Sequence, residues 1–470
     1  MRQDLGLGAL IALVFSSMVG AGIFSLPQNM AQQAQVGAIA LGWLITGVGM
    51  LALACVYQRL ALRRPDLDGG IFTYARAGFG DFIGFNAAWG YWVCQLLANV
   101  SYVVVLFSAL SYFTDRPGHT LLGEGNTPLA IGLGSVLVWG VHLLILKGVR
   151  RAALVNLVAT LAKLIPLLVL CVALLLAFHL ETFRLDVWGE QALGGVLEQV
   201  TSTMKVTLWV FIGIEGAVVV SARARRRQDV GRATLIALLG ALALYVMVSL
   251  FALGVMSQPE VAALKNPSTA AILAQIVGPW GAWLINIGMV ISVLGAFLSW
   301  TLLASEVPFI AAQSGLFPRW FSRLNQHGTP KHGLWATTLL VQLFLLVILL
   351  QESTYLALVN ITTSAALVPY FFSAAYGLKL AWQDRARAQA SAQDLLLGAL
   401  ASGYGLWLVY AAGVEYLLLA TLLYVPGLLI LHLARRQRGQ TWGRAEALGG
   451  LILVCLAAWS AWRWAQGLLG

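Results

Sequence analysis

The chain has 470 residues, and its composition excludes a soluble globular protein. Apolar residues of the AVILMFWYC set make up 60% of it, and charged residues only 10%. Soluble domains carry about 25% charged residues, so 19 acidic and 29 basic side chains cannot cover a surface of this size in water. We therefore expect a protein embedded in lipid. The same composition excludes a disordered chain, a coiled coil and a secreted disulfide scaffold.

Thirteen apolar stretches follow one another along the chain. They lie near residues 6–30, 37–58, 82–112, 127–146, 152–178, 199–222, 233–256, 280–313, 333–350, 355–378, 395–412, 414–433 and 447–465. Each is long enough, as a helix, to cross a hydrocarbon core about 30 Å thick. The sequence therefore predicts an all-α polytopic membrane protein with 12–13 transmembrane helices. It leaves open whether the stretch at 447–465 crosses the bilayer or lies along the interface.

Basic residues gather in alternate loops. Of the 29 Lys and Arg residues, 23 lie in one set of loops together with the N-terminus, and four lie in the opposite set. The remaining two, Lys163 and Lys205, lie within or beside apolar stretches. Cytoplasmic loops carry such an excess of positive charge, so we expect a cytoplasmic N-terminus. The net charge of +10 is then a consequence of topology, and no nucleic-acid partner is expected.

The motifs of several other protein classes are missing from the sequence. No Gly-Lys-Ser/Thr phosphate loop, HExxH or GxSxG motif occurs, so an ATP-driven pump and an intramembrane enzyme are not expected. No repeated ring of charges or carbonyls suggests a channel. The four cysteines, at positions 55, 94, 171 and 455, lie in apolar stretches without paired spacing. We expect packed thiols there, and neither a metal site nor a cofactor.

Two of the apolar stretches are interrupted by glycine. The first contains Ser16–Phe24 with Gly20 and Gly22, and the sixth contains Trp209–Gly216, with Gly213 standing 193 residues after Gly20. Lipid tolerates unpaired backbone groups only where they line a protected cavity. Free N–H groups at a helix start suit a carboxylate, and free carbonyls at a helix end suit an ammonium group. Paired breaks therefore predict a site for a small zwitterion, although glycines also serve close helix packing.

Further features recur at nearly the same offset, as expected for an internal repeat. The connector at Gly69–Gly70 is followed about 200 residues later by the stretch from Pro267 to Pro279, and Lys163 precedes Asn360 by 197. These offsets predict two five-helix halves followed by additional helices. The expected units are a first repeat at 1–180, a second repeat at 197–380 and C-terminal helices at 395–470.

Three motifs resemble the amino acid–polyamine–organocation superfamily. They are GAGIF at 20–24, WVFIGIEG at 209–216 and WTLLASEVPFIAAQSGLFP at 300–318. Over residues 1–435 the chain looks most like the bacterial basic amino acid/polyamine antiporters, especially arginine/ornithine exchangers. The resemblance implies a five-plus-five inverted-repeat fold with unwound helices 1 and 6. It also implies a bacterial inner-membrane location, amino acid substrates, and a homodimer as one option for assembly.

The resemblance implies a set of substrate-binding positions. Backbone amides of Ala21 and Gly22, with Ile23 beside them, would hold the α-carboxylate, and the carbonyls of Met18, Trp209 and Ile212 would hold the α-amino group. Trp209 would also act as an outer lid. Trp300 would stack on a guanidinium or alkyl-ammonium side chain, a contact worth about 0.5–2 kcal/mol. Tyr91, Asn99 and Asn360 would line the pocket and its gate.

Two ionisable residues are candidates for gating or proton coupling. Glu215 lies within an apolar stretch, where a carboxylate costs about 2–3 kcal/mol or more and therefore marks a functional hypothesis. The alternative is a structural hydrogen bond to the unwound backbone. The resemblance implies that Lys163 replaces a sodium ion and braces helices 1, 5 and 8. Glu306 lies nearer the cytoplasmic end of the eighth stretch, so we expect it to be a structural partner of the basic loops. Lys205 either faces the outer mouth of the pathway or snorkels to the lipid headgroups.

The leading hypothesis is an exchanger of arginine for ornithine by alternating access. Proton-coupled uptake of a neutral or aromatic amino acid is an alternative, favoured by Lys163 and Lys205. Exchange of an amino acid for its decarboxylation product, such as histidine for histamine or lysine for cadaverine, also stays open.

Overall fold

The structure of the protein is a computed structural model that describes residues 5–67, 69–116, 118–184, 186–189, 193–351, 355–386 and 391–466. The side chains at 149–151, 350–351, 355–362 and 386 are not among the described parts. Within these limits the chain consists of helices and connecting turns and contains no strand longer than an isolated bridge. The all-α prediction is confirmed.

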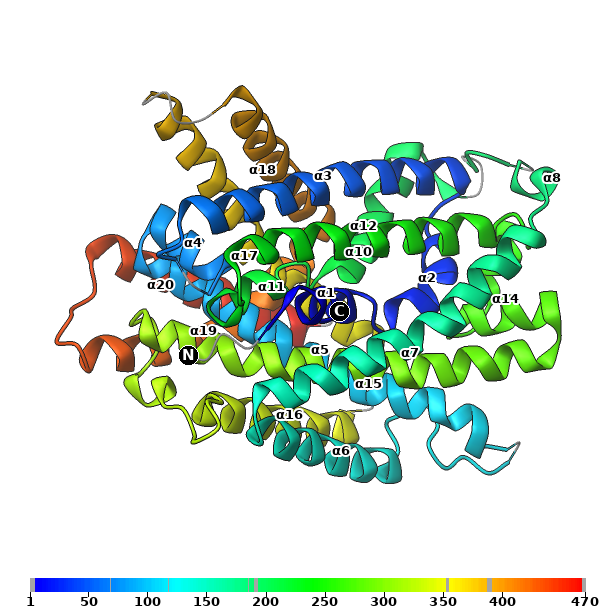
Figure 1. Ribbon diagram of the computed structural model, residues 1–470, viewed down its shortest axis with the longest axis horizontal. Helices are drawn as coiled ribbons and strands as arrows, with labels where there is room; N and C mark the ends of the chain where they lie inside the picture. Colours follow the sequence, from blue (N-terminus) through cyan, green and yellow to red (C-terminus); the bar gives the residue numbers. More distant parts are fainter. Residues whose placement is uncertain are drawn as a thin grey trace.

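The helices of the first half are α1 (Leu7–Met18), α2 (Gly22–Ala31), α3 (Val36–Arg63), α4 (Ile71–Phe79), α5 (Asp81–Thr114), α6 (Pro128–Leu146), α7 (Val149–Leu176) and α8 (Leu180–Phe183) (Figure 1). Next come α10 (Val196–Phe211), α11 (Gly216–Val219), η1 (Ser221–Arg223), α12 (Arg227–Ala252), α13 (Gln258–Ala263), α14 (Ser268–Val277), α15 (Pro279–Gln313), η2 (Arg319–Ser322), α16 (Lys331–Gln351) and α17 (Tyr355–Ala386). The C-terminal helices are α18 (Ala392–Ala412), α19 (Val414–Arg436) and α20 (Arg444–Ala465).

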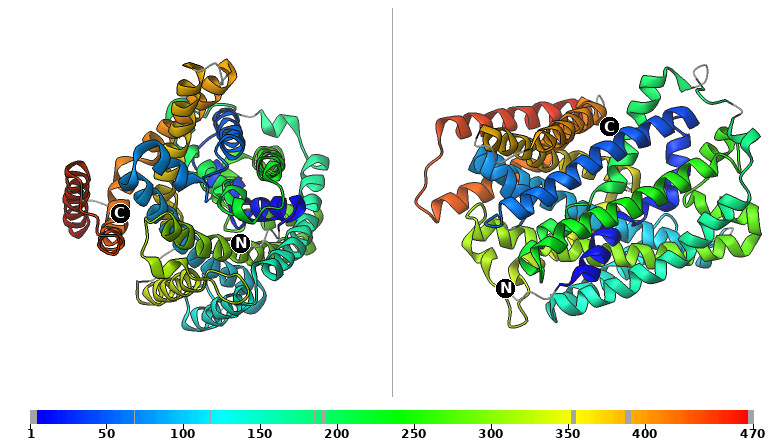
Figure 2. Two further views of the ribbon diagram at one scale, coloured as in Figure 1. Left: turned by 60° about the vertical axis from the view of Figure 1, so that its left-hand side comes forward. Right: turned by 45° about the horizontal axis from the view of Figure 1, so that its top comes forward.

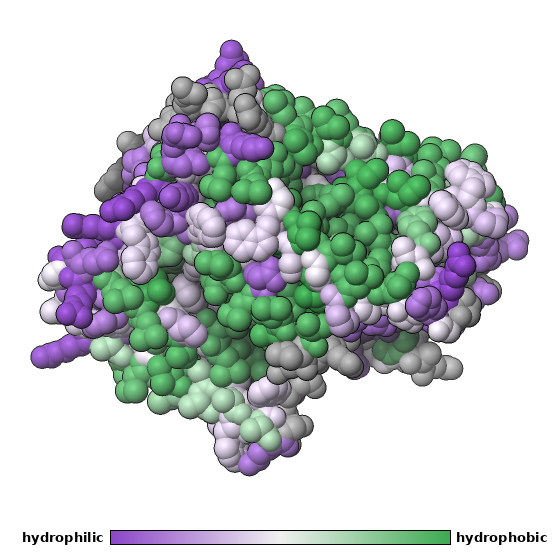
Figure 3. Space-filling view, turned by 90° about the horizontal axis from the view of Figure 1, so that it is seen from below, coloured by the Kyte–Doolittle hydropathy of each residue, from purple (hydrophilic) through white to green (hydrophobic). Residues whose placement is uncertain are grey.

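Eleven spans among the described residues are long and apolar enough to cross a membrane, with α1 and α2 together forming the first. The other two predicted stretches correspond to the broken pair α10–α11 and to α17, which has 32 residues. Apolar side chains cover the middle of the face in Figure 3, and hydrophilic ones gather at its two ends. This banding is what a bilayer requires of the surface that it surrounds.

The C-terminal helix α20 packs on α19 at the outside of the bundle, where Figure 2 shows it in dark red. Only 17% of its most apolar window is buried inside the molecule. Cys455 on this helix is exposed, so the prediction of a packed thiol is wrong for this residue, because α20 has few neighbours. Cys94 and Cys171 are buried as predicted, and Cys55 is partly so.

Both predicted helix breaks are present. Helix α1 ends at Met18 and α2 begins at Gly22, while α10 ends at Phe211 and a turn of four residues precedes α11. Gly213 in that turn has a φ of +112°, a conformation that side chains rarely adopt. A Cβ at this position would also lie 2.7 Å from Ser17 Oγ. The sixth helix therefore breaks where glycine permits both the turn and the close approach.

A second structural repeat lies at the corners that lead into the two longest helices. Gly80 joins α4 to α5 with φ +88° and ψ 177°, and Gly278 joins α14 to α15 with φ +90° and ψ −177°. These glycines are 198 residues apart, and Figure 1 shows α4 and α14 at opposite ends of the bundle. This match supports two repeats of opposite orientation. The limits at 1–180, 197–380 and 395–470 stay predictions.

The broken helices lie at the centre of the bundle (Figure 1). Helix α1 packs against α7, α11, α12 and α15, and the long helices α5 and α15 pack against each other. Helix α17 contacts α4 and α5, and α18 covers α3 and α17 from outside. The paired breaks are thereby shielded from lipid on all sides, which lets their backbone stay irregular.

Candidate functional site

The two helix breaks meet at Ser17. Its hydroxyl Oγ lies 2.9 Å from Val14 O and 3.0 Å from Gly213 O, so it joins the end of α1 to the turn after α10. Its carbonyl accepts a hydrogen bond of 2.8 Å from Trp300 Nε1 on α15. Three elements far apart in the sequence are thus fixed at one residue. Ser17 was not among the predicted site residues.

Backbone groups at the breaks lie close together, where the sequence predicts a zwitterion site. The N–H groups of Gly22 and Ile23 open helix α2 and have no acceptor within it, because the first turn of any helix lacks one. A Cβ on Gly22 would lie 2.8 Å from Val210 Cγ1 and 3.4 Å from Trp209 Cδ1, so the end of α10 packs directly on this helix start. Positive and negative helix ends are therefore adjacent.

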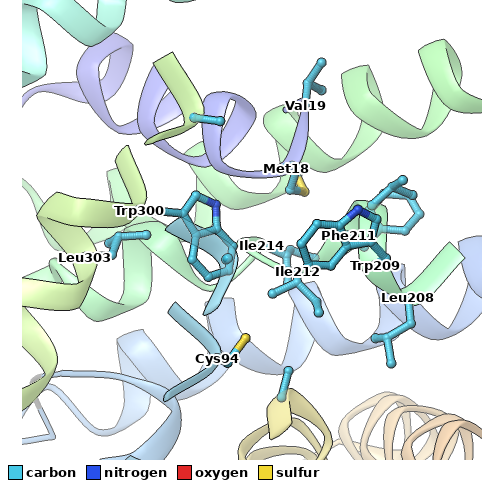
Figure 4. Close-up of a cluster of buried hydrophobic side chains, with 14 of the residues drawn as sticks. Met18, Val19, Cys94, Leu208, Trp209, Phe211, Ile212, Ile214, Trp300 and Leu303 are labelled. Carbon is cyan, nitrogen blue, oxygen red and sulfur yellow. The ribbon is translucent and has the colours of Figure 1, made fainter. Parts of the chain in front are cut away.

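The predicted carbonyl positions also come together. Met18, Trp209 and Ile212 lie around one another in Figure 4, with Trp300 entering from the other side. The carbonyl of Met18 accepts from Gly20 N at 2.9 Å, and that of Trp209 accepts from Ile212 N at 3.3 Å. Each carbonyl oxygen has two lone pairs, so both can accept a further donor. All of these side chains are buried, as is Ala21.

A row of aromatic rings closes the site. Tyr102 on α5 lies between Trp209 and Trp300, and its ring centre is 6.5 Å from the centre of each. Tyr102, Trp209 and Trp300 are 4%, 8% and 1% exposed, respectively. A Cβ on Gly20 would lie 2.8 Å from the Tyr102 hydroxyl. These rings therefore cover the site on one side, and Tyr102 was not among the predicted site residues.

Helix α5 presents a line of polar side chains toward the centre. Tyr91, Gln95 and Asn99 follow one another at intervals of four residues and so share one face. Thr301 Oγ1 donates to Asn99 Oδ1 at 3.4 Å, while Asn99 Nδ2 and both amide atoms of Gln95 meet no partner at hydrogen-bonding geometry within the described part of the chain. Buried unpaired polar groups are costly, so these amides are candidates for contact with a ligand. Gln95 was not predicted.

Glu215 lies between the unwound turn and two tyrosines. It is fully buried and accepts hydrogen bonds from the hydroxyls of Tyr91 on α5 and Tyr370 on α17. The backbone N–H of Gly213 lies 3.2 Å from Glu215 Oε2 and equally far from the Tyr370 hydroxyl. The predicted bond to the unwound backbone is therefore present. The carboxylate thus links three elements: α5, α17 and the turn that precedes α11. Tyr370 was not among the predicted site residues.

Lys163 braces the first break from the side of α7. Its buried ammonium Nζ donates to Val19 O at 2.6 Å and to Ser16 Oγ at 3.1 Å. From α15, Ser292 Oγ lies 3.1 Å from both Val19 O and Gly20 O. Lys163 thus links helix 5 to helix 1, and helix 8 reaches the same acceptor, Val19 O, through Ser292. An ammonium group thus occupies the position beside these carbonyls that a bound cation would need.

Lys205 and Glu306 lie apart from this centre, and Asn360 is described only by its backbone. Lys205 Nζ is 4.8 Å from the ring centre of Tyr416 on α19, so it points toward the C-terminal helices and away from Trp209. Glu306 forms a buried ion pair of 2.6 Å with Arg223, as the sequence predicted. Asn360 belongs to α17 by its backbone, and its side chain lies outside the described residues.

Comparisons with known proteins agree with this architecture. Residues 5–445 match the model of the amino acid permease family. An Escherichia coli K12 protein, provisionally named an arginine/ornithine antiporter, is 53% identical over 437 residues, which cover 93% of each chain. The arginine/ornithine antiporter of Pseudomonas aeruginosa is 48% identical over 449 residues, covering 93% of this chain and 92% of the relative. The arginine/agmatine antiporter of Chlamydia abortus is 42% identical over 435 residues, covering 91% and 89%. With a family match and relatives that span nearly all of its length, the chain belongs to the amino acid permease family, whose members are multi-pass membrane transporters.

Proposed function

We propose that the protein exchanges cationic amino acids, arginine for ornithine, across the bacterial inner membrane by alternating access, with its N-terminus in the cytoplasm. The names of the relatives supply the substrate pair. The observation that carries the proposal is the indole of Trp300, which Ser17 O fixes beside the paired breaks. A planar cation gains most over an indole ring, and the breaks accept the zwitterionic end that every amino acid shares.

In this proposal the amides of Gly22 and Ile23 bind the substrate α-carboxylate, because the start of α2 carries positive partial charge. The carbonyls of Met18 and Ile212 accept the α-ammonium group. The side-chain cation lies over Trp300, and the buried amide oxygen of Gln95 on α5 is the candidate acceptor for its N–H groups. A guanidinium offers five N–H donors and no acceptor, so it suits this set of acceptors.

Alternating access would follow from the two closures described above. Tyr102 and Trp209 cover the site toward the end of the bundle opposite the basic loops. The hydroxyls that bind Glu215 close it on the other side. A transporter of this kind opens one closure at a time, so that the substrate never meets a continuous pore.

Uptake of radiolabelled arginine into proteoliposomes tests the proposal. The vesicles are loaded with ornithine, arginine, agmatine, a neutral amino acid or nothing. We expect uptake only with a cationic substrate inside, and no effect of a proton ionophore. Uptake into empty vesicles driven by an acid exterior would overturn the exchanger and favour proton coupling. Uptake driven by agmatine but not by ornithine would overturn the substrate pair.

Removing the indole face should weaken arginine binding. We expect Trp300→Ala to raise the KM for arginine about tenfold, within the range of a buried cation–π contact. Trp300→Phe keeps an aromatic face and should recover most of the loss. Trp382, which is 73% exposed on α17, provides the matched control, and Trp382→Ala should leave KM unchanged. Equal KM values for Trp300→Ala and the wild type would contradict the stacking role.

The position of Lys163 predicts transport without sodium. Its ammonium group already donates a hydrogen bond to Val19 O beside the unwound segment, so exchange should be equal in sodium and choline buffers. Lys163→Met removes both hydrogen bonds and should lower the exchange rate at least about tenfold, the effect of losing a charged donor. Uptake rates in the two buffers measure the first effect. A wild type that requires sodium would contradict this role for Lys163.

A further inference from the structure

A cavity of about 240 Å³ lies between the C-terminal helix α20 and the rest of the bundle. Its walls come from α5, α17, α19 and α20. Helices α5, α19 and α20 are long and apolar enough to cross a membrane, so hydrocarbon surrounds this part of the molecule. An apolar cavity of about 150 Å³ can bind benzene. The larger cavity here has room for part of a longer apolar chain.

The wall of this cavity is apolar, because most of the side chains that line it are aliphatic or aromatic. Two of its polar side chains donate to carbonyls of their own helices. Asn86 Nδ2 donates to Phe82 O at 2.8 Å, and Thr421 Oγ1 donates to Leu418 O at 2.6 Å. A polar ligand would lose its hydration here with little in return. The wall therefore suits a hydrocarbon chain.

The helices around the cavity are in close contact elsewhere. A Cβ on Gly427 of α19 would lie 2.7 Å from Trp89 Cδ2 on α5, and a Cβ on Gly449 of α20 would lie 2.9 Å from Phe82 Cε1, also on α5. Trp89 Nε1 donates to Leu423 O at 2.8 Å and fixes the first of these contacts. The cavity is therefore a gap between helices that are held against one another, and loose packing does not account for it.

The cavity opens to the surface beside α20, which stands at the margin of the bundle (Figure 2). Ile452 and Leu456 on its wall are 51% and 38% exposed, whereas Ala420 is 4% exposed. A helix is about 10 Å wide, so no helix of a partner protein fits into this space. A water-soluble ligand would have to cross hydrocarbon to reach it. The acyl chain of a membrane lipid meets neither obstacle.

Three exposed arginines lie where α19 ends and α20 begins. They are Arg436, Arg438 and Arg444. Within the part of the chain that the structure describes, none of them forms an ion pair, whereas Arg435 beside them is paired with Glu446. Basic side chains at the cytoplasmic surface of a membrane attract anionic headgroups. This turn is therefore complementary in charge to a lipid phosphate.

The arginines and the mouth of the cavity are within reach of one lipid. Ile452 lies eight residues after Arg444 on α20, a rise of about 12 Å. Half of the hydrocarbon core is about 15 Å thick. A lipid whose headgroup lies at this turn therefore has its acyl chain beside Ile452, at the level where the cavity opens.

We propose that this cavity binds one acyl chain of an anionic phospholipid, whose phosphate lies at the three arginines. The chain packs behind α5 and α17, the helices whose Tyr91 and Tyr370 hydroxyls bind Glu215. A filled cavity holds these two helices at the spacing that the closure at Glu215 needs. The binding site does not depend on the identity of the substrate. Its effect on transport rests on the proposed function of exchange.

Native mass spectrometry of the purified protein tests the site, with phosphatidylglycerol or phosphatidylethanolamine of the same chain length as the probe. We expect one phosphatidylglycerol per chain to be retained more tightly than phosphatidylethanolamine. Ala420→Phe fills the cavity and should weaken this retention at least about tenfold, since each excluded methylene group lowers the affinity several-fold. Ala458→Phe is the matched control, because Ala458 is exposed on α20 and does not line the cavity. Wild-type retention by Ala420→Phe would overturn the cavity as the site.

A second set of variants tests the headgroup. Arg436→Gln, Arg438→Gln and Arg444→Gln together should abolish the preference for phosphatidylglycerol, because each basic residue near the surface strengthens the binding of an anionic lipid several-fold. The control replaces three exposed arginines of another loop with glutamine and should keep the preference; they are Arg225, Arg226 and Arg232. Equal retention of the two lipids by the wild type would overturn the anionic headgroup.

If Ala420→Phe fails to fold, Ile452→Trp replaces it. Ile452 is half-exposed at the mouth of the cavity, so a larger side chain can be accommodated there while it blocks the entry of a lipid chain. This variant should show the same loss of phosphatidylglycerol, and wild-type retention would overturn the inference.

Exchange measurements separate the lipid site from the proposed function. Arginine exchange should be several-fold slower in vesicles of phosphatidylethanolamine alone than in vesicles that also contain phosphatidylglycerol, and Ala420→Phe should be slow in both. Equal rates of the wild type in the two membranes would overturn the role of the lipid in the closure. A protein that retains phosphatidylglycerol as expected but never exchanges arginine would overturn the proposed function and leave the lipid site intact.

Discussion

Glu215→Gln should lower the rate of exchange at least about tenfold while leaving the protein folded. The carboxylate accepts from two tyrosine hydroxyls and one backbone N–H. A glutamine amide replaces one acceptor oxygen with a donor, so at least one of these bonds is lost or reversed. Hydrogen bonds to a charged acceptor contribute about 1.5–3 kcal/mol each. The exchange rate at saturating arginine, together with gel-filtration behaviour, measures the effect.

Two comparisons make the Glu215 result specific. Tyr91→Phe and Tyr370→Phe remove one donor each and should each reproduce part of the loss. Glu198→Gln changes an exposed carboxylate on α10 and should leave the rate unchanged. Wild-type exchange by Glu215→Gln at every pH at which the protein is stable would remove Glu215 from the mechanism.

Arg223→Ala should destabilise the protein by about 3–5 kcal/mol, the usual result of leaving one partner of a buried ion pair alone. Arg223 and Glu306 are 3% and 1% exposed, and Arg223 also donates to Gly328 O at 3.0 Å. Its backbone carbonyl accepts from Leu5 N at 3.0 Å. The residue therefore ties the chain start, the end of the sixth helix, α15 and the loop before α16. Thermal aggregation of the purified protein measures the loss.

A double variant distinguishes the contribution of the ion pair to stability from that of side-chain packing. Arg223→Leu with Glu306→Leu removes both charges, and apolar pairs of similar volume often restore or increase stability. We expect it to be more stable than Arg223→Ala. The double variant also removes a link at the end of the bundle that carries the basic loops. It should therefore favour the conformation open at that end and lower the internal KM. A double variant less stable than the single one would contradict this account.

The sequence predicts the breaks well because their cause is local. A glycine cluster within an apolar stretch has few stable conformations in lipid. Gly213 adopts a positive φ that residues with a side chain rarely adopt. Lys163 and Glu215 were also predictable, since an ionisable group in such a stretch needs a specific partner. The repeat was visible from offsets alone, and the corners at Gly80 and Gly278 give it a structural counterpart.

The partners in the site could not be predicted in the same way. Tyr370 reaches Glu215 across 155 residues, and Ser17 reaches Gly213 across 196. Nothing in the local sequence separates these from the other tyrosines and serines, since only the packing of distant helices makes them neighbours. Tyr102 lies three residues after Asn99 on α5, so extending the polar face by one turn would have found it. The direction of Lys205 likewise depends on α19, which the sequence could not place.

The corners at Gly80 and Gly278 have a thermodynamic consequence. Because the same backbone geometry recurs at opposite ends, we expect the conformation open to one side to be built from interactions like those of the conformation open to the other. Two such conformations have similar free energies, so neither traps the molecule. The direction of net movement is then set by the substrate concentrations on the two sides, and a ligand of modest affinity is enough to shift the population.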